Sequence, residues 1–396
     1  MPLASLSLSR PVISVGLSAF LVGALALSGC SSPPKVVSKP AVSKTTIAVV
    51  KPAPFRATGI PADLAAVIKP LYLGGTVPLS PTAARALAKR KTVKVAGTVV
   101  VKGSVASWRG VPIAVVTHGK DVTLAVKAPR WRVVGGWWPS LGVSAASLGR
   151  SPRRVLLAGS DARPGEPLDG SRADSLHIVA FDGRGGGGVL GIPRDSYVPL
   201  ASGGSGKINS ALTFGGPVGL QQTVASVTGV PLEGYILTGF DGFQQLVGGI
   251  GGALPINVPV AVKDDLSGAN VKAGPNRLSP FQALAYGRAR HAVAGGDFGR
   301  SANQGLLILA AAGFAKQVGP IELPRMLQIG APQIETNLSA EQVLTFAAGV
   351  FVTRPDKVQN RVATGGSGWT ADRQSIVLLD ANARNLFADI RDGNLS

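Results

Sequence analysis

The chain has very little cysteine and histidine. It contains one cysteine, Cys30, and three histidines, His118, His177 and His291, among 396 residues. One cysteine cannot form an internal disulfide bond, so the sequence neither requires nor excludes an oxidising compartment. The histidines are widely separated and no cysteine cluster accompanies them. We therefore expect no zinc site and interpret each histidine as structural.

Several catalytic motifs are also absent. The sequence has no G-x-S-x-G and no H-E-x-x-H segment. Residues 183–188 fit G-x-G-x-x-G, but a short apolar strand follows them instead of a helix, so we predict a turn and not a dinucleotide site. Residues 203–207 resemble part of a P-loop, yet Ile208 stands where Ser or Thr is needed and the first glycine is missing.

Acidic residues are scarce in the first third of the chain. The formal net charge is +19, and residues 31–150 hold 18 Lys and Arg against two acids, Asp63 and Asp121. Residues 151–396 are almost balanced, with 21 basic and 19 acidic residues. A basic module of this kind can contact nucleic acid, anionic lipid or an anionic polymer, and charge alone does not choose among them.

The N-terminus carries the features of an export signal. After Arg10, residues 11–27 form an apolar run that ends in Leu27-Ser-Gly-Cys30. This pattern predicts a secretory signal, and its ending resembles a bacterial lipobox, in which the cysteine receives a lipid. The alternative is one transmembrane anchor, because about 17–20 apolar residues nearly span a bilayer. With Cys30 lipidated, we expect the protein at the extracytoplasmic face of the cell membrane.

Composition divides the chain into four predicted parts. These are a lipoprotein signal peptide (1–30), a tether rich in Ser, Pro, Lys and Val (31–59), a small basic β-rich module (60–150) and a larger domain (151–396). In the module we predict a helix over 81–91 and strands over 93–101, 113–117 and 122–126. We expect Trp131, Trp137 and Trp138 to pack against a neighbouring domain.

The larger domain alternates between strand and helix patterns. We predict strands over 155–159, 175–181, 189–192 and 256–260, with a hairpin joining the second and third. Helices are predicted over 219–228, 240–250, 280–287, 298–316 and 339–350, and Ser339 and Gln342 have the spacing of a capping box. Consecutive strands joined as hairpins and mixed with helices indicate an α/β fold, with a mixed sheet flanked by helices.

Two aspartates lie at the two ends of one connection between predicted strands. Asp161 and Arg163 follow the first strand, and Arg172 and Asp174 precede the next. Because these strands are predicted neighbours, the two ends can converge. Two carboxylates without cysteine or histidine favour a hard cation such as Mg²⁺, which keeps several waters and binds phosphates.

Further charged residues follow along the chain. Arg194 and Asp195 come directly after a strand, and Lys207 and Asn209 follow a Gly/Ser loop. Arg288 and Arg290 would diverge on one helix, but on extended chain after Gly287 they point the same way. Asp297 is expected to cap the next helix, which leaves Arg300 and Gln304 on one face. Planar guanidinium groups suit bidentate binding of phosphate.

The order of these motifs, GSD-x-R, R-x-D, PRD, KIN, R-x-R-H and D-F-x-R-x-x-x-Q, resembles the LytR-CpsA-Psr family of cell-envelope ligases. The resemblance covers about residues 153–320 and extends more weakly towards Asp392. The sequence departs from the family pattern at Ala173, at Ser210 after KIN, and at Ala302. The basic β-rich module lies outside the resemblance.

The resemblance implies an α/β core around an apolar tunnel that holds a polyprenyl chain, with its pyrophosphate at a charged mouth. Such proteins transfer a glycopolymer from a polyprenyl-pyrophosphate carrier to a peptidoglycan hydroxyl, usually with Mg²⁺, and some pyrophosphatase activity is expected. Asp161 and Asp174 would hold the metal, and either is a candidate general base. Pyrophosphate would be gripped by Arg172, Arg194, Arg288 and Arg290. Supporting residues would be Arg163, Asp195, Lys207, Asn209, Asp297, Arg300 and Gln304.

Two alternatives remain open from the sequence. In the first, the protein is a non-catalytic lipoprotein whose arginines only capture an anionic lipid headgroup or wall polymer. In the second, the net charge of +19 marks a nucleic-acid-binding regulator. The export signal argues against the second, so we expect the carrier lipid, peptidoglycan and the membrane as partners and no nucleic acid.

Overall fold

The computed structural model describes residues 54–91, 97–163, 165–291 and 293–396. The predicted signal peptide with its lipid-attachment residue Cys30, and residues 31–53 of the predicted tether, lie outside the described residues. Two six-stranded sheets organise the described part, one built from residues 55–147 and the other from residues that follow. We call them sheet A and sheet B.

Sheet A is an antiparallel meander with one parallel strand added at its edge. Its strands, in spatial order, are β1 (Phe55–Thr58), β2 (Val99–Trp108), β3 (Val111–His118), β4 (Asp121–Lys127), β5 (Trp131–Trp138) and β6 (Val143–Ser147). Helices α1 (Ala62–Leu73) and α2 (Pro81–Leu87) share a buried apolar cluster with it. The predicted helix and the strands over 113–117 and 122–126 are confirmed.

Two boundaries differ from the prediction. The tether was expected to run to residue 59, but Phe55–Thr58 forms β1 and pairs with Val99–Lys102 of β2. Of the predicted strand over 93–101, residues 92–96 lie outside the described part, and β2 continues to Trp108. This four-residue segment forms a strand because it pairs with the edge of β2 and packs Phe55 and Ala57 on the apolar cluster, and neither partner is visible in the local sequence.

The tryptophan cluster mostly fills the core of sheet A itself. Trp131 and Trp138 are 4% and 0% exposed and belong to the cluster shared with α1 and α2. The indole Nε1 of Trp138 donates to Thr123 Oγ1 at 2.8 Å. Only Trp137 packs on a second cluster, which includes Leu344 of helix α8 (Ala340–Val352). The expectation that all three contact a neighbouring domain was therefore wrong for two of them.

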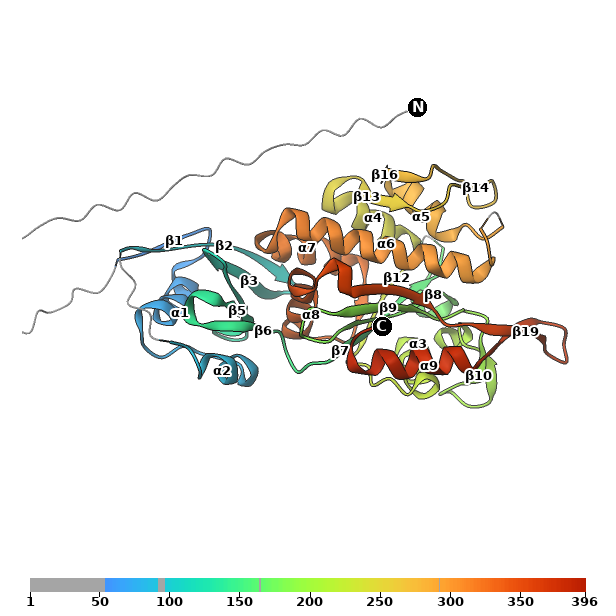
Figure 1. Ribbon diagram of the computed structural model, residues 1–396, viewed down its shortest axis with the longest axis horizontal. Helices are drawn as coiled ribbons and strands as arrows, with labels where there is room; N and C mark the ends of the chain where they lie inside the picture. Colours follow the sequence, from blue (N-terminus) through green and yellow to red (C-terminus); the bar gives the residue numbers. More distant parts are fainter. Residues whose placement is uncertain (1–53, 92–96, 164, 292) are drawn as a thin grey trace, which may run out of the picture. The chain divides into compact units, whose positions relative to one another are not determined.

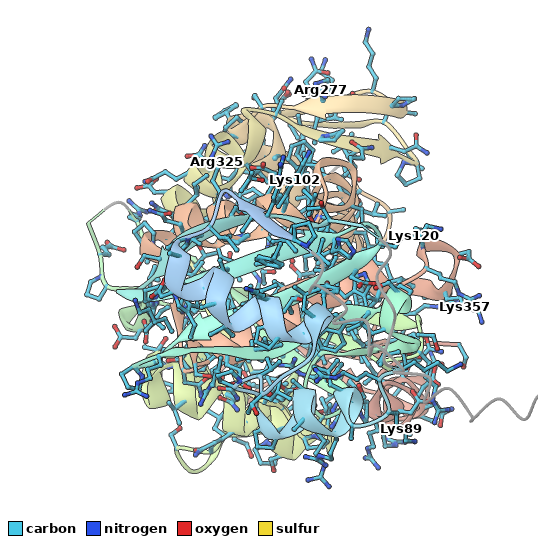
Figure 2. All side chains as sticks on the ribbon, turned by 90° about the vertical axis from the view of Figure 1, so that its left-hand side faces the viewer. Lys89, Lys102, Lys120, Arg277, Arg325 and Lys357 are labelled. Atoms are coloured by element: carbon cyan, nitrogen blue, oxygen red, sulfur yellow. The ribbon has the colours of Figure 1, made fainter. Side chains whose placement is uncertain are left out.

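The positive charge of the sheet A region is carried on its surface. Lys89, Lys102 and Lys120 are exposed, and Figure 2 shows them on the side of the molecule where this region faces the viewer. Within the described residues, this region makes two ion pairs, Lys127 with Asp63 and Arg132 with Glu341. Most of its basic side chains are thus uncompensated by neighbouring acids.

Sheet B is mixed, as predicted, in the order β17-β12-β7-β8-β9-β18. The pairs β7–β8 and β8–β9 are antiparallel, whereas β12–β7 and β9–β18 are parallel. The strands are β7 (Arg153–Ser160), β8 (Ala173–Phe181), β9 (Gly187–Gly191), β12 (Tyr235–Thr238), β17 (Glu335–Thr336) and β18 (Val358–Val362). The glycine-rich segment after Phe181 is the turn between β8 and β9, as the sequence predicted.

Helices cover both faces of sheet B (Figure 1). On one face α3 (Ser210–Thr228) and α9 (Ala381–Asp389) share a buried apolar cluster with strands β7 to β9. On the other lie α4 (Phe240–Gly251), α5 (Pro280–Arg288) and α6 (Asp297–Val318). The predicted helices over 240–250, 280–287 and 298–316 are confirmed, whereas α3 begins nine residues before the predicted start at 219. The remaining helices are α7 (Leu323–Gly330) and α8 (Ala340–Val352), and α8 begins with the predicted Ser339–Gln342 capping box.

The smaller strands form antiparallel pairs around sheet B. They pair as β10 (Tyr197–Pro199) with β11 (Ser205–Lys207), β13 (Leu254–Val258) with β16 (Gly274–Leu278), β14 (Val262–Asp264) with β15 (Ala269–Val271), and β19 (Gly365–Trp369) with β20 (Ser375–Leu379). The β13–β16 pair and the β14–β15 hairpin between its strands precede α5 in the chain and share a buried apolar cluster with it. The position of α5 at the cavity described below therefore depends on them.

A glycine lets helix α6 lie unusually close to sheet B. A side chain on Gly191 of β9 would place its Cβ 2.3 Å from Ser301 Oγ and 3.2 Å from His177 Nε2. Distances this short require the neighbours to move, so the helix packs against bare backbone here. In the described part of the chain no single helix has the length and composition of a membrane span. The bent pair Asp297–Val318 and Pro320–Gln333 meets that test only jointly.

Candidate active site

A cavity of about 580 Å³ lies between sheet B and helices α4, α5 and α6. Ligand pockets in proteins are commonly about 300–1,000 Å³. Most of its wall is apolar, and the side chains come from strands, from all three helices and from the segment before β17. They include Leu157, Ile236, Phe240, Phe243, Leu246, Val247, Ile250, Leu284, Leu307, Ile308, Ala311 and Ile334.

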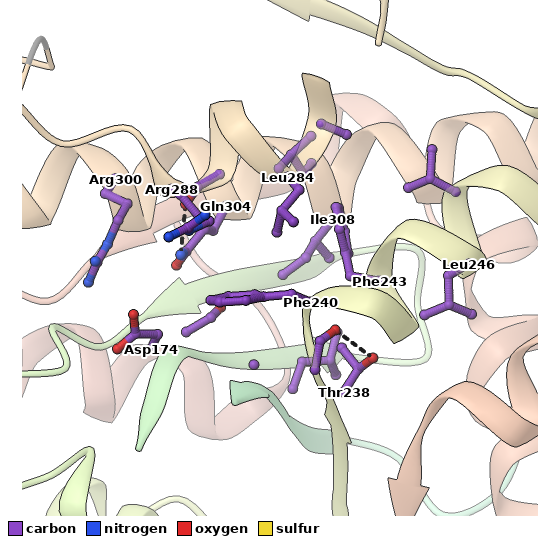
Figure 3. A pocket seen from close by; sticks show the side chains of 18 of the residues that line it. Asp174, Thr238, Phe240, Phe243, Leu246, Leu284, Arg288, Arg300, Gln304 and Ile308 are labelled. Atoms are coloured by element: carbon purple, nitrogen blue, oxygen red, sulfur yellow. Dashed lines mark hydrogen bonds between the residues drawn. The ribbon is translucent and has the colours of Figure 1, made fainter. Parts of the chain in front are cut away.

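One end of the cavity is charged. Six residues predicted from the sequence line the cavity: Asp174, Arg194, Arg288, Arg290, Arg300 and Gln304. In Figure 3, Asp174, Arg288 and Arg300 lie towards one side of the view and Leu246 lies at the other, with Phe240 between them. The cavity therefore joins a polar, cation-rich end to an apolar interior, as an amphiphilic anion requires.

A β-bulge brings Asp174 to this site. Gly159 pairs with Ser175 and Ser160 pairs with Ala173, so Asp174 is an extra residue on β8 without a partner on β7. Bulges re-aim a side chain that regular alternation would direct elsewhere. Asp174 and Ser175, although adjacent in the chain, consequently both line the cavity. No local sequence pattern predicts this bulge.

Arg194 is the centre of a charge network. Its Nη1 donates to Asp174 Oδ1 at 2.5 Å, and its Nε lies 3.6 Å from Asp297 and 3.8 Å from Asp195. Burial lowers the pKa of Arg194, but the surrounding carboxylates, Asp174 first among them, raise it above its usual value overall. Lys207 approaches Asp195 at 3.0 Å, so this lysine is part of the network and not a solvated surface group.

Asp297 has a different role from the predicted one. Helix α6 begins at Asp297 and its N-cap is Gly296, with no side-chain cap. The prediction of Asp297 as a cap was therefore wrong. Its carboxylate instead lies 2.7 Å from Arg300 Nη2 and 3.6 Å from Arg194, because the first turn of α6 faces both arginines. Arg300 is 6% exposed, and burial lowers its pKa despite Asp297.

Arg288 and Arg290 reach the cavity from the end of α5. The helix ends at Arg288, and Ala289 adopts extended backbone, which allows both arginines to approach one site, as predicted. The Arg288 guanidinium lies 4.8 Å from the centroid of the Phe240 ring. Both side chains are exposed, and no ion pair with another described residue involves either. They are therefore available to a bound anion.

Sequence reasoning missed Asp264, which holds the segment that carries Arg290 and His291 in place. The residue is 3% exposed, lines the cavity and accepts the backbone N–H groups of Arg290 at 2.9 Å and His291 at 3.1 Å. Burial raises its pKa, but these and other backbone donors lower it overall, so the carboxylate stays ionised. Asp264 lies on β14, 26 residues before Arg290, and no motif links them.

The remaining predicted residues do not line the cavity, although most of them contact Arg194 or one of its ion-pair partners. Asp161 and Arg172 are joined at the two ends of the β7–β8 connection: Arg172 N–H donates to Asp161 Oδ1 at 2.8 Å. Asn209 is 3% exposed. Its backbone N–H donates to the carbonyl oxygen of Arg194, and its own carbonyl oxygen accepts the backbone N–H of Ala173. The side chains of Arg163 and Arg172 are exposed.

Asp161 and Asp174 are the two carboxylates for which the sequence predicted a cation. Within the described residues no group of three or more His, Cys, Asp and Glu side chains is arranged as a metal site. Asp161 and Asp174 provide oxygen only, and Asp174 Oδ1 is occupied by Arg194. Mg²⁺ is typically held by one or two carboxylates together with phosphate oxygens and water, so this donor set fits Mg²⁺ that arrives with a phosphorylated ligand.

Comparison with known proteins agrees with the family resemblance of the motifs. The model of the LytR_cpsA_psr family matches residues 140–387, which is more than half of the chain. A polyisoprenyl-teichoic acid–peptidoglycan teichoic acid transferase, TagU, of Bacillus mycoides is 36% identical over 172 residues, 42% of this chain and 53% of TagU. TagU of Bacillus anthracis is 33% identical over 202 residues, 48% of this chain and 62% of TagU.

A solved structure extends the comparison to the fold. The crystal structure of Bacillus subtilis TagV superposes with a TM-score of 0.52 at 26% identity, over 62% of this chain and all of TagV. The chain spans about half to three fifths of the length of the two TagU proteins. The matched region contains sheet B and the cavity, and it excludes most of sheet A.

Proposed function

This chain belongs to the LytR-CpsA-Psr family, and on that premise we propose that it is a phosphotransferase of cell-wall biogenesis. It moves a glycopolymer from a polyprenyl-pyrophosphate carrier to a peptidoglycan hydroxyl. The observation that carries the proposal is that one cavity combines two chemistries: an apolar interior and an end lined by Arg194, Arg288, Arg290 and Arg300.

The cavity matches both parts of such a carrier. Aromatic and aliphatic side chains of α4 and α6 suit a polyprenyl chain, because burying apolar surface is favourable at about 25 cal/mol per Å². The exposed guanidiniums of Arg288 and Arg290 suit its pyrophosphate through charge-assisted hydrogen bonds. An apolar chain and a doubly phosphorylated headgroup can thus be held at once.

The residues then have distinct tasks in the transfer. The hydroxyl oxygen attacks the phosphorus that bears the glycopolymer, the bond to the bridging oxygen breaks, polyprenyl phosphate leaves, and the hydroxyl proton is released to solvent. Arg288, Arg290 and Arg300 stabilise the charge that spreads over the phosphate oxygens. Arg194 holds Asp174 in place. Mg²⁺, held by Asp161 and Asp174 when bound, would neutralise further charge.

The sequence supports a location for this chemistry. The lipobox-like ending at Cys30 would anchor the protein by lipid at the extracytoplasmic face of the membrane. A carrier lipid and its headgroup are available at that surface, so anchoring there brings enzyme and donor together. Labelling cells with a radioactive fatty acid tests this: wild-type protein should take up label and Cys30→Ala should not.

Hydrolysis of geranylgeranyl pyrophosphate by the full-length protein in detergent, with Mg²⁺, tests the activity. Arg288→Ala should reduce kcat/KM about 10- to 100-fold, because a charge-assisted hydrogen bond contributes about 1.5–3 kcal/mol. Arg277→Ala, which removes an exposed arginine from β16, is the matched control and should behave as wild type. Tight lipid binding without turnover would instead favour a non-catalytic lipid-binding protein.

A further inference from the structure

A buried histidine lies directly behind the charged end of the cavity. Ser175 and His177 are two residues apart on β8, so their side chains lie on the same face of sheet B. Ser175 lines the cavity, whereas His177 is 0% exposed. Their side chains are joined, because Ser175 Oγ lies 3.2 Å from His177 Nδ1. The other ring nitrogen, Nε2, lies 3.0 Å from the Ser301 carbonyl oxygen on α6.

These two contacts determine where the protons lie. A carbonyl oxygen only accepts, so Nε2 of His177 must carry the hydrogen that it donates to Ser301. A neutral imidazole has one N–H, and burial lowers the pKa of His177 to about 4, so the ring is neutral near pH 7. Nδ1 is therefore an acceptor, and the Ser175 hydroxyl donates its hydrogen to it.

With its hydrogen directed backwards, the Ser175 oxygen offers only lone pairs to the cavity. Four arginines, whose side chains can only donate, line the same cavity: Arg194, Arg288, Arg290 and Arg300. Asp174 Oδ1 is occupied by Arg194, and Asp264 accepts backbone N–H groups. The pyrophosphate has only acceptor oxygens and suits the arginines. A hydroxyl with a hydrogen to donate suits Ser175.

We propose that Ser175 accepts a hydrogen bond from the attacking hydroxyl and so orients its oxygen towards the phosphorus, with His177 as the positioning residue that keeps Ser175 an acceptor. The proposal rests on the proposed function and assigns to it the residues that align the nucleophile. His177 is not the base, since a protonated imidazole would be buried without a counter-charge. A hydroxyl held in line reacts faster because its orientation has already been fixed.

Four variants test the proposal in the hydrolysis of geranylgeranyl pyrophosphate, in which water is the attacking hydroxyl. Ser175→Ala should lower kcat about tenfold, the effect of losing one hydrogen bond, and leave the KM for the lipid unchanged. Ser175→Thr keeps the hydroxyl and should retain most of the activity. His177→Met should lower kcat in the same direction, whereas His177→Asn, whose Oδ1 can occupy the position of Nδ1, should lose less.

A double-mutant cycle separates positioning from mere packing. If His177 acts only through Ser175, then Ser175→Ala combined with His177→Met should be no slower than Ser175→Ala alone. Additive losses in kcat would overturn the role of His177, and an unchanged kcat in Ser175→Ala would overturn the whole inference. Ser202→Ala, on an exposed loop, is the control for serine removal.

Two further outcomes are distinguishable. A wild-type protein without any hydrolysis or transfer would remove the proposed function, and this inference with it. Active wild-type protein with fully active Ser175→Ala would remove the inference alone. Should His177→Met not fold, as judged by circular dichroism, the contrast between Ser175→Ala and Ser175→Thr decides the outcome, since loss in both would show that the hydroxyl is not what matters.

Discussion

The carboxylate of Asp264 accepts the backbone N–H of Arg290 at 2.9 Å, and so the β14–β15 hairpin fixes the segment that presents Arg288 and Arg290. We predict that Asp264→Asn weakens pyrophosphate binding about 5- to 100-fold, because an amide nitrogen in place of Oδ2 cannot accept, and the backbone N–H groups of Arg290 and His291, which both donate to Oδ2, are left unpaired. Titration of the full-length protein with geranylgeranyl pyrophosphate measures the change.

The neighbouring carboxylate is the matched control for that experiment. Asp265 is exposed on the same turn, and Asp265→Asn removes the same charge without the buried contact. We expect it to bind the lipid as wild type does. Equal weakening in both variants would mean that the net charge of the hairpin, and not the orientation of Arg290, determines affinity.

Narrowing the apolar interior should select against long carriers. Leu246 lines the cavity on α4, so Leu246→Trp fills part of its apolar volume. We predict that this variant loses affinity for polyprenyl pyrophosphates of long chain and binds dimethylallyl pyrophosphate unchanged, since the charged end is not altered. Gln245→Trp, on the exposed side of the same helix, is the control. Parallel losses with both lipids would contradict an apolar tunnel.

Stability should depend strongly on one ion pair whose arginine is buried and whose glutamate is partly buried. The Arg153 side chain is 5% exposed, and its Nη2 lies 2.7 Å from Glu233, while Nη1 donates to Thr345 of α8 at 3.0 Å. Arg153→Ala should lower the free energy of unfolding by about 3–5 kcal/mol, because Glu233 is left without its partner. Urea denaturation followed by circular dichroism measures this.

Removing both charges of this ion pair should lower the free energy of unfolding much less than removing one of them. In Arg153→Met with Glu233→Leu no ion is left unpaired, so most of the lost stability should return. Arg150→Ala, at an exposed position nearby, should have almost no effect. A double variant as unstable as Arg153→Ala would show that the packing of the guanidinium on α8, and not its charge, stabilises the fold.

His177 should make stability depend on pH. Its pKa is lowered to about 4 by burial in the folded chain and is about 6.5 in the unfolded chain. As pH falls between these values, only the unfolded chain binds the proton, so unfolding becomes easier by about 3 kcal/mol. Urea denaturation at pH 7 and pH 4.5 should show most of this loss in wild type and a smaller one in His177→Asn. Equal losses would contradict a buried neutral histidine.

Elements with strong periodicity were predictable from the sequence. The spans of α4, α5, α6 and α8 and of strands β7 to β9 were identified because apolar spacing, Pro at first turns and capping pairs act within a few residues. Elements that depend on distant partners were missed. Strand β1 forms because β2 lies beside it, and Asp297 pairs with arginines because α6 begins at the cavity.

The candidate active site also has a part that the sequence predicted and a part that only the tertiary structure determines. The order of charged motifs along the chain identified the family and six residues that line the cavity, since residue type and spacing can be read without a structure. Asp161, Arg163 and Arg172 were predicted for the same site but do not line the cavity. Local pattern does not encode the bulge at Asp174, the hold of Asp264 on Arg290 or the pairing of Ser175 with His177. Hydrogen bonds between elements many residues apart, and the irregular strand pairing that permits them, exist only once the sheet and its helices have closed around the cavity.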